Sequence, residues 1–100
     1  MRIDTVGRDI EITPAIRQYA EQKAAKLSKY FDGLQQVTIT VQRTHAHHTH
    51  EFTVELVADV EKHDDFVSRA QGADLYATID EASEKAGRQL RDYKERLKDH

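Results

Sequence analysis

Hydrophobic residues recur every three or four positions from Asp74 to His100, with charged residues between them. On a helix of 3.6 residues per turn, seven of these apolar side chains fall within about 80° of one another, so the pattern predicts one long helix with a single buried face. These side chains are Leu75, Ile79, Ala82, Ala86, Leu90, Tyr93 and Leu97. On the remaining surface, residues 85–98 hold six basic residues against two acidic ones, a net charge of +4.

A second helix is predicted from Pro14 to about Phe31. Thr13 supplies a hydroxyl N-cap, and Pro14 occupies the first helical position, where its missing N–H has no cost. Asp32 and Gly33 then end the helix. The predicted buried positions are Ile16, Ala20, Ala24, Leu27 and Phe31, with Tyr19 and Tyr30 at the edge of the stripe.

The remaining segments predict strands. Apolar and polar residues alternate over 37–42 and over 51–61, which is the period of half-buried strands, and the shorter segments 2–7 and 66–70 favour two more. The connection at 45–50 reverses the chain, so the second and third strands are expected to form an antiparallel hairpin. This β-α-β-β-β-α order predicts an α+β two-layer sandwich, a four-stranded sheet with both helices on one face. We expect the outer face of the sheet to be open to water and acidic.

The composition indicates one domain spanning residues 1–100 in a reducing compartment. A chain of 100 residues can bury a core of its own, and the absence of cysteine excludes a thiol nucleophile, a disulfide framework and a cysteine-based zinc site. No apolar run approaches the roughly 20 residues of a membrane span, and the amino terminus lacks a signal-peptide pattern. We therefore expect a cytoplasmic protein with no membrane partner.

Charge is distributed unevenly along the chain, although its formal total is only −3. Residues 14–31 carry a net charge of +3 and residues 51–65 a net charge of −5, so two helices on one side of the fold would present a basic face. Such a face is either a solvated surface that stabilises the helices or a site that neutralises nucleic-acid phosphates. Tyr76 lies beyond the edge of the apolar stripe and, if exposed, could stack on an unpaired base.

Catalytic chemistry has little support in the sequence. Ser28, Ser68 and Ser83 belong to no nucleophile motif, and there is no glycine-rich phosphate loop. We expect neither an enzyme nor a cofactor, and no small-molecule substrate.

A run of four histidines stands out between the second and third predicted strands, at His45, His47, His48 and His50. Imidazole is the commonest protein ligand for divalent metals, so these residues are the candidate ligands if the chain has a metal site. A structural site needs ligands held at set geometry by a second shell, and a hairpin loop supplies neither. Solvated histidines are therefore favoured over a metal site or a contact to an acidic or nucleic-acid partner.

Several segments together resemble the ribosome hibernation promoting factor family, also called ribosome-associated inhibitor or sigma-54 modulation proteins. These segments are Ile10–Arg17, Lys26–Asp32 and Asp74–Asp80, followed by Lys85 and Arg88–Leu90. The resemblance covers essentially the whole chain and implies a fold similar to double-stranded RNA-binding domains. It also implies binding to the small ribosomal subunit and its rRNA, in the mRNA and tRNA channel over the decoding region. Translation would be blocked there under stress or in stationary phase.

Carried over position by position, the resemblance implies a set of RNA-binding residues. They are Lys23, Lys26, Lys29, Tyr76, Lys85, Arg88, Arg91, Lys94 and Lys98. The histidine run is not part of the family pattern. The chain also ends at His100, so it is expected to be either a short family member or the amino-terminal domain of a longer one with a C-terminal dimerisation domain. Two alternative functions remain, a generic structured-RNA-binding domain and a histidine-rich metal-responsive protein.

Overall fold

The structure is a computed structural model that describes residues 1–44 and 51–98. Its elements follow the order that the sequence predicts. They are β1 (Arg2–Arg8), α1 (Pro14–Lys26), the 3₁₀ turn η1 (Leu27–Lys29), β2 (Leu34–Thr44), β3 (Glu51–Val60), β4 (Phe66–Gly72) and α2 (Leu75–Lys98). Within the described ranges, no helix is both long enough and apolar enough to cross a membrane.

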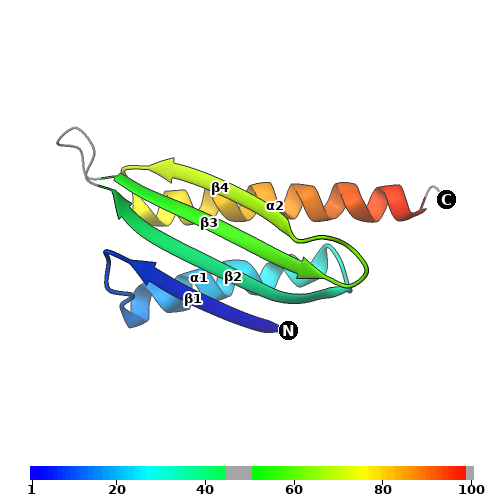
Figure 1. Ribbon diagram of the computed structural model, residues 1–100, viewed down its shortest axis with the longest axis horizontal. Coiled ribbons are helices and arrows are strands. Elements are labelled where there is room, and N and C mark those ends of the chain that lie inside the picture. Colours follow the sequence, from blue (N-terminus) through cyan, green and yellow to red (C-terminus); the bar gives the residue numbers. More distant parts are fainter. Residues whose placement is uncertain (45–50, 99–100) are drawn as a thin grey trace.

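The four strands form one sheet in the order β1-β2-β3-β4. β2 pairs antiparallel with β3, as predicted, and β3 pairs antiparallel with β4, whereas β1 runs parallel to β2. A parallel pair needs a crossover connection, and α1 supplies it. Both helices lie on the same face of the sheet, where α1 packs against β1 and α2 against β3 and β4 (Figure 1). The predicted two-layer architecture is confirmed.

The core lies between the sheet and the two helices. Alternate residues of the central strands point into it and are fully buried, including Ile39 on β2 and Leu56 on β3. The helices contribute the predicted stripes, of which Ala20, Ala24 and Leu90 have no exposed surface. Sequence periodicity therefore identified the packed face of each element.

Helix α1 begins as predicted and ends earlier than predicted. Thr13 Oγ1 accepts a 3.2 Å hydrogen bond from the backbone N–H of Ile16. At the other end, the N–H of Leu27 reaches the carbonyls of both Ala24 and Ala25, which tightens the chain into the 3₁₀ turn η1. Such i→i+3 bonds close the last turn of a helix, so the regular helix does not continue to Phe31.

Helix α2 extends past the end of the sheet (Figure 1). Asp74 precedes it, and Asp74 Oδ1 accepts a hydrogen bond of 3.2 Å from the N–H of Ala77. The predicted buried stripe holds as far as Tyr93, which is half-buried, but Leu97 is 49% exposed. Leu97 has the correct helical phase for burial but lies beyond the strands that would cover it. The prediction that it belongs to the core is wrong.

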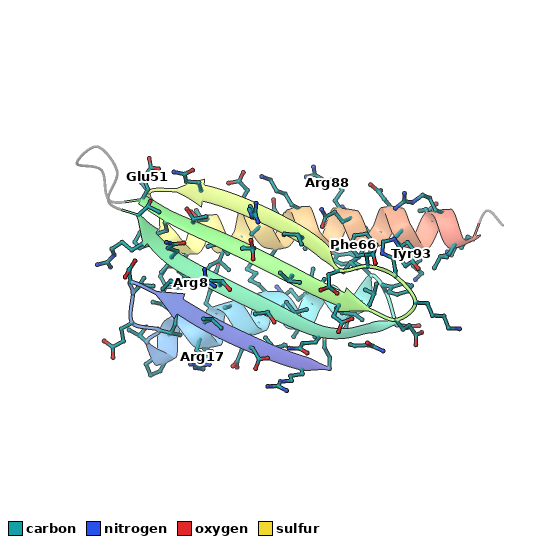
Figure 2. The ribbon with its side chains drawn as sticks, in the orientation of Figure 1. Arg8, Arg17, Glu51, Phe66, Arg88 and Tyr93 are labelled. Atoms are coloured by element: carbon teal, nitrogen blue, oxygen red, sulfur yellow. The ribbon has the colours of Figure 1, made fainter. Side chains whose placement is uncertain are left out.

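An aromatic cluster closes the core where α2 leaves the sheet. The ring of His63 stacks on Phe66 with centroids 4.6 Å apart, and Tyr93 lies 5.4 Å from Phe66 (Figure 2). Phe31 packs edge-on against Tyr93 at 5.2 Å. The turn before β4 and the segment after η1 are thereby joined to the last covered turn of α2.

The outer face of the sheet carries both signs of charge, so it is less acidic than predicted. The strand register places four carboxylates and three guanidinium groups there. They are Asp4, Glu51, Glu55 and Asp59 against Arg2, Arg8 and Arg69. Arg69 Nε lies 2.8 Å from Glu55 Oε2, and Arg2 pairs with Asp4 at 3.1 Å. The sequence count over 51–65 omitted the arginines that β1 and β4 bring to this face.

Candidate nucleic-acid interface

Three polar side chains join the two helices. Tyr19 Oη on α1 donates a 2.6 Å hydrogen bond to Asp80 Oδ1 on α2, and Lys23 Nζ lies 3.0 Å from the same oxygen. Lys23 also lies over the Tyr19 ring, 5.4 Å from its centroid. The two helices are therefore fixed side by side along the flank where their basic residues meet.

The ionisation of these groups follows from that geometry. Burial disfavours the Asp80 carboxylate, but the hydrogen bonds from Tyr19 and Lys23 outweigh it and hold the pKa of Asp80 below its ordinary value. The hydrogen bond to Asp80 raises the pKa of both Tyr19 and Lys23. Lys23 is one of the predicted RNA-binding residues, and its charge is balanced by Asp80.

A groove runs between α1 and α2 next to this contact, and we call it the interhelical groove. It has a volume of about 310 Å³. Its lining residues are Lys23, Lys26, Leu27, Tyr30, Asp80, Ser83, Glu84, Gly87, Arg88 and Arg91. Two helices far apart in sequence therefore bring four cationic side chains to one concave surface.

Arg91 is held at this groove by an aromatic ring. Its guanidinium carbon lies 5.2 Å from the centroid of the Tyr30 ring, a cation–π distance. Tyr30 in turn lies close to α2 at Gly87, where an added Cβ would be 3.0 Å from Tyr30 Cε2. The absence of a side chain at Gly87 thus allows the ring to lie against α2 and to support Arg91.

The interhelical groove carries an excess of positive charge. Among the described residues, Lys26, Arg88 and Arg91 form no ion pair, and Glu84 is the one lining acid that lacks one. With Lys23 and Asp80 balancing each other, the excess is two positive charges. Lysine and arginine without an acidic partner are suited to phosphate oxygens, and arginine can bind them with two parallel hydrogen bonds.

Three further predicted residues extend this cationic surface. Lys29 lies in η1 and is exposed, as are Lys94 and Lys98 on α2. Positions three and four residues apart share a helix face, so Arg91, Lys94 and Lys98 follow one another along α2. The cationic surface therefore runs from the groove toward the end of α2 that projects past the sheet.

Lys85 lies away from the groove. Its Nζ donates a 2.9 Å hydrogen bond to the carbonyl of Arg69 on β4 and lies 3.6 Å from Glu81 Oε1. One turn later, Gln89 Nε2 donates to the carbonyl of Val67 at 3.0 Å. This flank of α2 faces β4, so Lys85 lies outside the interhelical groove, whereas Arg88 lines both that groove and a second pocket that includes Lys85.

Tyr76 is exposed, whereas the sequence alone allowed it to be either buried or exposed. It is 41% exposed, and its ring packs edge-on against Tyr19 with centroids 4.9 Å apart. Tyr19 also contacts Lys23 and Asp80, so Tyr76 extends the interhelical contact toward the start of α2. Part of its ring remains accessible beside the helix-joining contact.

The predicted metal candidates His45, His47, His48 and His50 lie outside the described residues. Within 1–44 and 51–98, no three histidine, aspartate or glutamate side chains are arranged to hold a metal ion.

Sequence reasoning missed several residues that shape the groove. Tyr30 supports Arg91, and Ser83 and Gly87 form part of the α2 wall. Ser83 and Gly87 are small residues four positions apart on the flank of α2 that faces α1. That spacing is a sequence signal for close helix approach and could have located the groove.

Both the sequence and the fold match one family. The family described as "Sigma 54 modulation protein / S30EA ribosomal protein" matches residues 3–98 of the chain. The chain belongs to this family. It is 37% identical over 100 residues to the ribosome hibernation promoting factor of Escherichia coli (strain K12), and the alignment covers all of both proteins. The ribosome hibernation promotion factor of Lactococcus lactis subsp. cremoris is 36% identical over 92 residues, which are 91% of this chain and 48% of that protein.

Solved structures share the S30EA family fold seen here. The Protein Y N-terminal domain of Thermus thermophilus superposes with a TM-score of 0.81 at 32% identity, covering 93% of this chain and 99% of that domain. A ribosomal subunit interface protein from Coxiella burnetii superposes with a TM-score of 0.82 at 23% identity, covering 94% of this chain and 98% of that one. The second likeness shows the fold alone.

Proposed function

We propose that this chain is a ribosome hibernation factor that binds the small ribosomal subunit and blocks translation. The observation that carries the proposal is the convergence of Lys26, Arg88 and Arg91 on one groove between two helices. The relatives named ribosome hibernation promoting factor, which match the chain over its full length, support the same function.

The proposed contact is between the helix pair and rRNA phosphates in the mRNA and tRNA channel, over the decoding region. Lysine and arginine side chains on this face neutralise phosphates and release counterions, which gives affinity without reading base sequence. A protein in this channel excludes mRNA and tRNA by occupying their space. The mechanism needs no bond to be made or broken, so we propose a binding function, exercised in the cytoplasm where ribosomes act.

Co-sedimentation with purified small subunits tests the proposal. The wild-type chain is expected in the pellet at low salt, with the bound fraction falling as salt rises. The variant Arg88→Glu/Arg91→Glu reverses two groove charges and is expected to remain in the supernatant, because it turns attraction for phosphate into repulsion. The matched control Arg8→Glu/Arg17→Glu makes the same charge change on β1 and on α1, away from Arg88 (Figure 2), and is expected to pellet with the subunits.

Circular dichroism of each variant separates lost binding from lost folding. Equal binding by the groove variant and its control would contradict the proposed site. A wild-type chain that stays in the supernatant at both low and moderate salt would contradict the function itself. Competition by free duplex RNA at equal phosphate concentration distinguishes a ribosome-specific factor from a generic RNA-binding domain, since only the generic domain would be displaced in full.

A further inference from the structure

The end of α2 carries one large apolar side chain among charged ones. Residues 94–98 are all exposed and project past the sheet (Figure 1). Three of them are basic and one, Glu95, is acidic, whereas Leu97 is apolar, 49% exposed and outside the packed core. The negative end of the helix dipole favours the basic residues, but it gives no reason for a leucine between them.

Cations flank Leu97 on both sides around the helix. Successive residues of an α-helix are about 100° apart, so Lys94 lies about 60° from Leu97, and Lys98 lies about 100° from it on the same side. Arg96 lies about 100° away on the other side. Among the described residues, none of these three cations forms an ion pair. Leu97 is therefore an accessible apolar side chain surrounded by uncompensated positive charge.

Leu97 is continuous with the cationic surface of the helix pair. Arg91 lines the interhelical groove, and Lys94 and Lys98 follow it along one flank of α2. The other exposed large apolar residues of the described chain are Met1 at the amino terminus, Val6 and Val67 on strands, and Tyr76, which packs against Tyr19. A ligand that follows the cationic surface along α2 beyond the groove therefore meets Leu97.

A ligand that suits this arrangement has anionic groups on either side of an apolar face. RNA has this chemistry wherever a base is unstacked, because the face of the base is then accessible between two phosphates. Leucine is among the apolar side chains that nucleic-acid-binding proteins insert against bases. In a regular duplex the faces of the bases are covered by stacking, so a duplex offers Leu97 no such contact.

We propose that Leu97 packs on the face of an unstacked rRNA base, while Lys94 and Arg96 bind the phosphates beside it. This inference rests on the proposed function and adds specificity to it. The cations attract any RNA, whereas Leu97 favours RNA with an accessible base face. Loops and bulges of folded RNA provide such bases, so Leu97 helps the chain to distinguish the small subunit from a plain duplex.

Binding of the full chain to purified small subunits over a range of salt concentrations tests the contact. Leu97→Ala is expected to weaken binding about tenfold at every salt concentration, because the burial of an apolar side chain is lost. The slope of log K against log salt should stay unchanged, since an apolar contact releases no counterions. Lys94→Gln is expected to lower that slope by about one phosphate contact. Leu97→Met keeps a long apolar side chain and should bind like the wild type.

The matched control is Val6→Ala. Val6 is 41% exposed but lies on β1, at the opposite edge of the sheet from β4, against which α2 packs. This variant is expected to bind small subunits as the wild type does, and circular dichroism checks that both alanine variants remain folded. Equal affinities of Leu97→Ala and Val6→Ala would overturn the proposal. A loss in Leu97→Ala that disappears at high salt would also overturn it, because the lost contact would then be electrostatic.

RNA of defined structure tests whether the contact is to a base. The probes are a plain duplex RNA and the same duplex with one bulged nucleotide. We expect the wild type to bind the bulged duplex more tightly and Leu97→Ala to bind the two equally. A preference for the bulge that persists in Leu97→Ala would assign it to another residue and overturn the proposal.

A photoreactive benzophenone side chain at position 97 identifies what lies against this residue in the ribosome complex. Crosslinks to rRNA nucleotides are expected, whereas crosslinks to a ribosomal protein or to a second copy of this chain would overturn the base contact. Failure of the inference is distinguishable from failure of the proposed function. Without the base contact, the wild type and Leu97→Ala pellet equally with small subunits; without the function, neither of them pellets.

Discussion

The phenol of Tyr19 and the carboxylate of Asp80 meet across 61 positions of sequence, at an O···O distance of 2.6 Å. Lys23 binds the same carboxylate oxygen at 3.0 Å, so Asp80 accepts from two residues one helical turn apart on α1. This arrangement sets the spacing of α1 and α2, and with it the width of the interhelical groove. The stability of the helix pair and the geometry of the cationic face are therefore coupled.

Replacing Asp80 by asparagine is expected to reduce stability in a pH-dependent way. The folded pKa of Asp80 lies below its unfolded value of about 3.9, so its contribution is fully present above that pH and is lost as the pH falls through the folded pKa. At pH 7 the expected loss is about 1 kcal/mol, because the side chain is 36% exposed and solvent screens the interaction. Urea unfolding of the wild type and of Asp80→Asn at pH 7 and pH 2.5 measures the difference in their free energies of unfolding. A difference that stays constant between the two pH values would exclude the carboxylate as its origin.

Leu90 and Leu97 share one helix stripe, but only Leu90 is expected to matter for stability. Leu90 is fully buried, so Leu90→Ala should lower the free energy of unfolding by about 2–5 kcal/mol. Leu97 is 49% exposed, and Leu97→Ala should change it by no more than about 0.5 kcal/mol. Thermal or urea unfolding of the two variants provides the comparison. Similar losses would mean that the last turn of α2 is covered in solution.

Lys85 and Gln89 cover the outer edge of β4 by binding the carbonyls of Arg69 and Val67. Unpaired strand edges can pair with other chains. Lys85→Ala/Gln89→Ala is therefore expected to increase self-association as concentration rises, detected by sedimentation velocity. Lys94→Ala/Lys98→Ala, which removes two exposed lysines from the same helix, serves as the control and should remain in the wild-type state. If neither variant associates, the two side chains are not needed to protect the edge.

The salt dependence of ribosome binding should separate Arg91 from Lys85. Each phosphate contact that is lost lowers the slope of log K against log salt by roughly 0.7–0.9. Arg91→Gln is expected to reduce the slope by about one contact, whereas Lys85→Gln should leave it unchanged because Lys85 is bound to β4. Binding isotherms at four salt concentrations measure both slopes. A larger change in the slope for Lys85→Gln than for Arg91→Gln would indicate that the interface lies on the opposite flank of α2.

Periodicity predicted the elements and the two buried helix faces because burial follows the 3.6-residue and two-residue repeats of the backbone. Periodicity wrongly predicted that Leu97 is buried, because the phase of a residue along a helix does not show where the sheet ends. The charge count over 51–65 predicted a more acidic outer sheet face than the structure has, because Arg69 lies beside Glu55 in the neighbouring strand. Sequence counts over one segment cannot include charges that strand pairing supplies.

The sequence by itself determined the order of the elements, the Thr13 cap, the side of each helix that packs and the family to which the chain belongs. Only the tertiary structure decided which cations act together. Lys26, Arg88 and Arg91 converge because two helices distant in sequence pack side by side, whereas Lys85, three residues from Arg88, faces β4. Local repeats record which side of an element avoids water, but a binding surface depends on distances between elements, and these are set by packing.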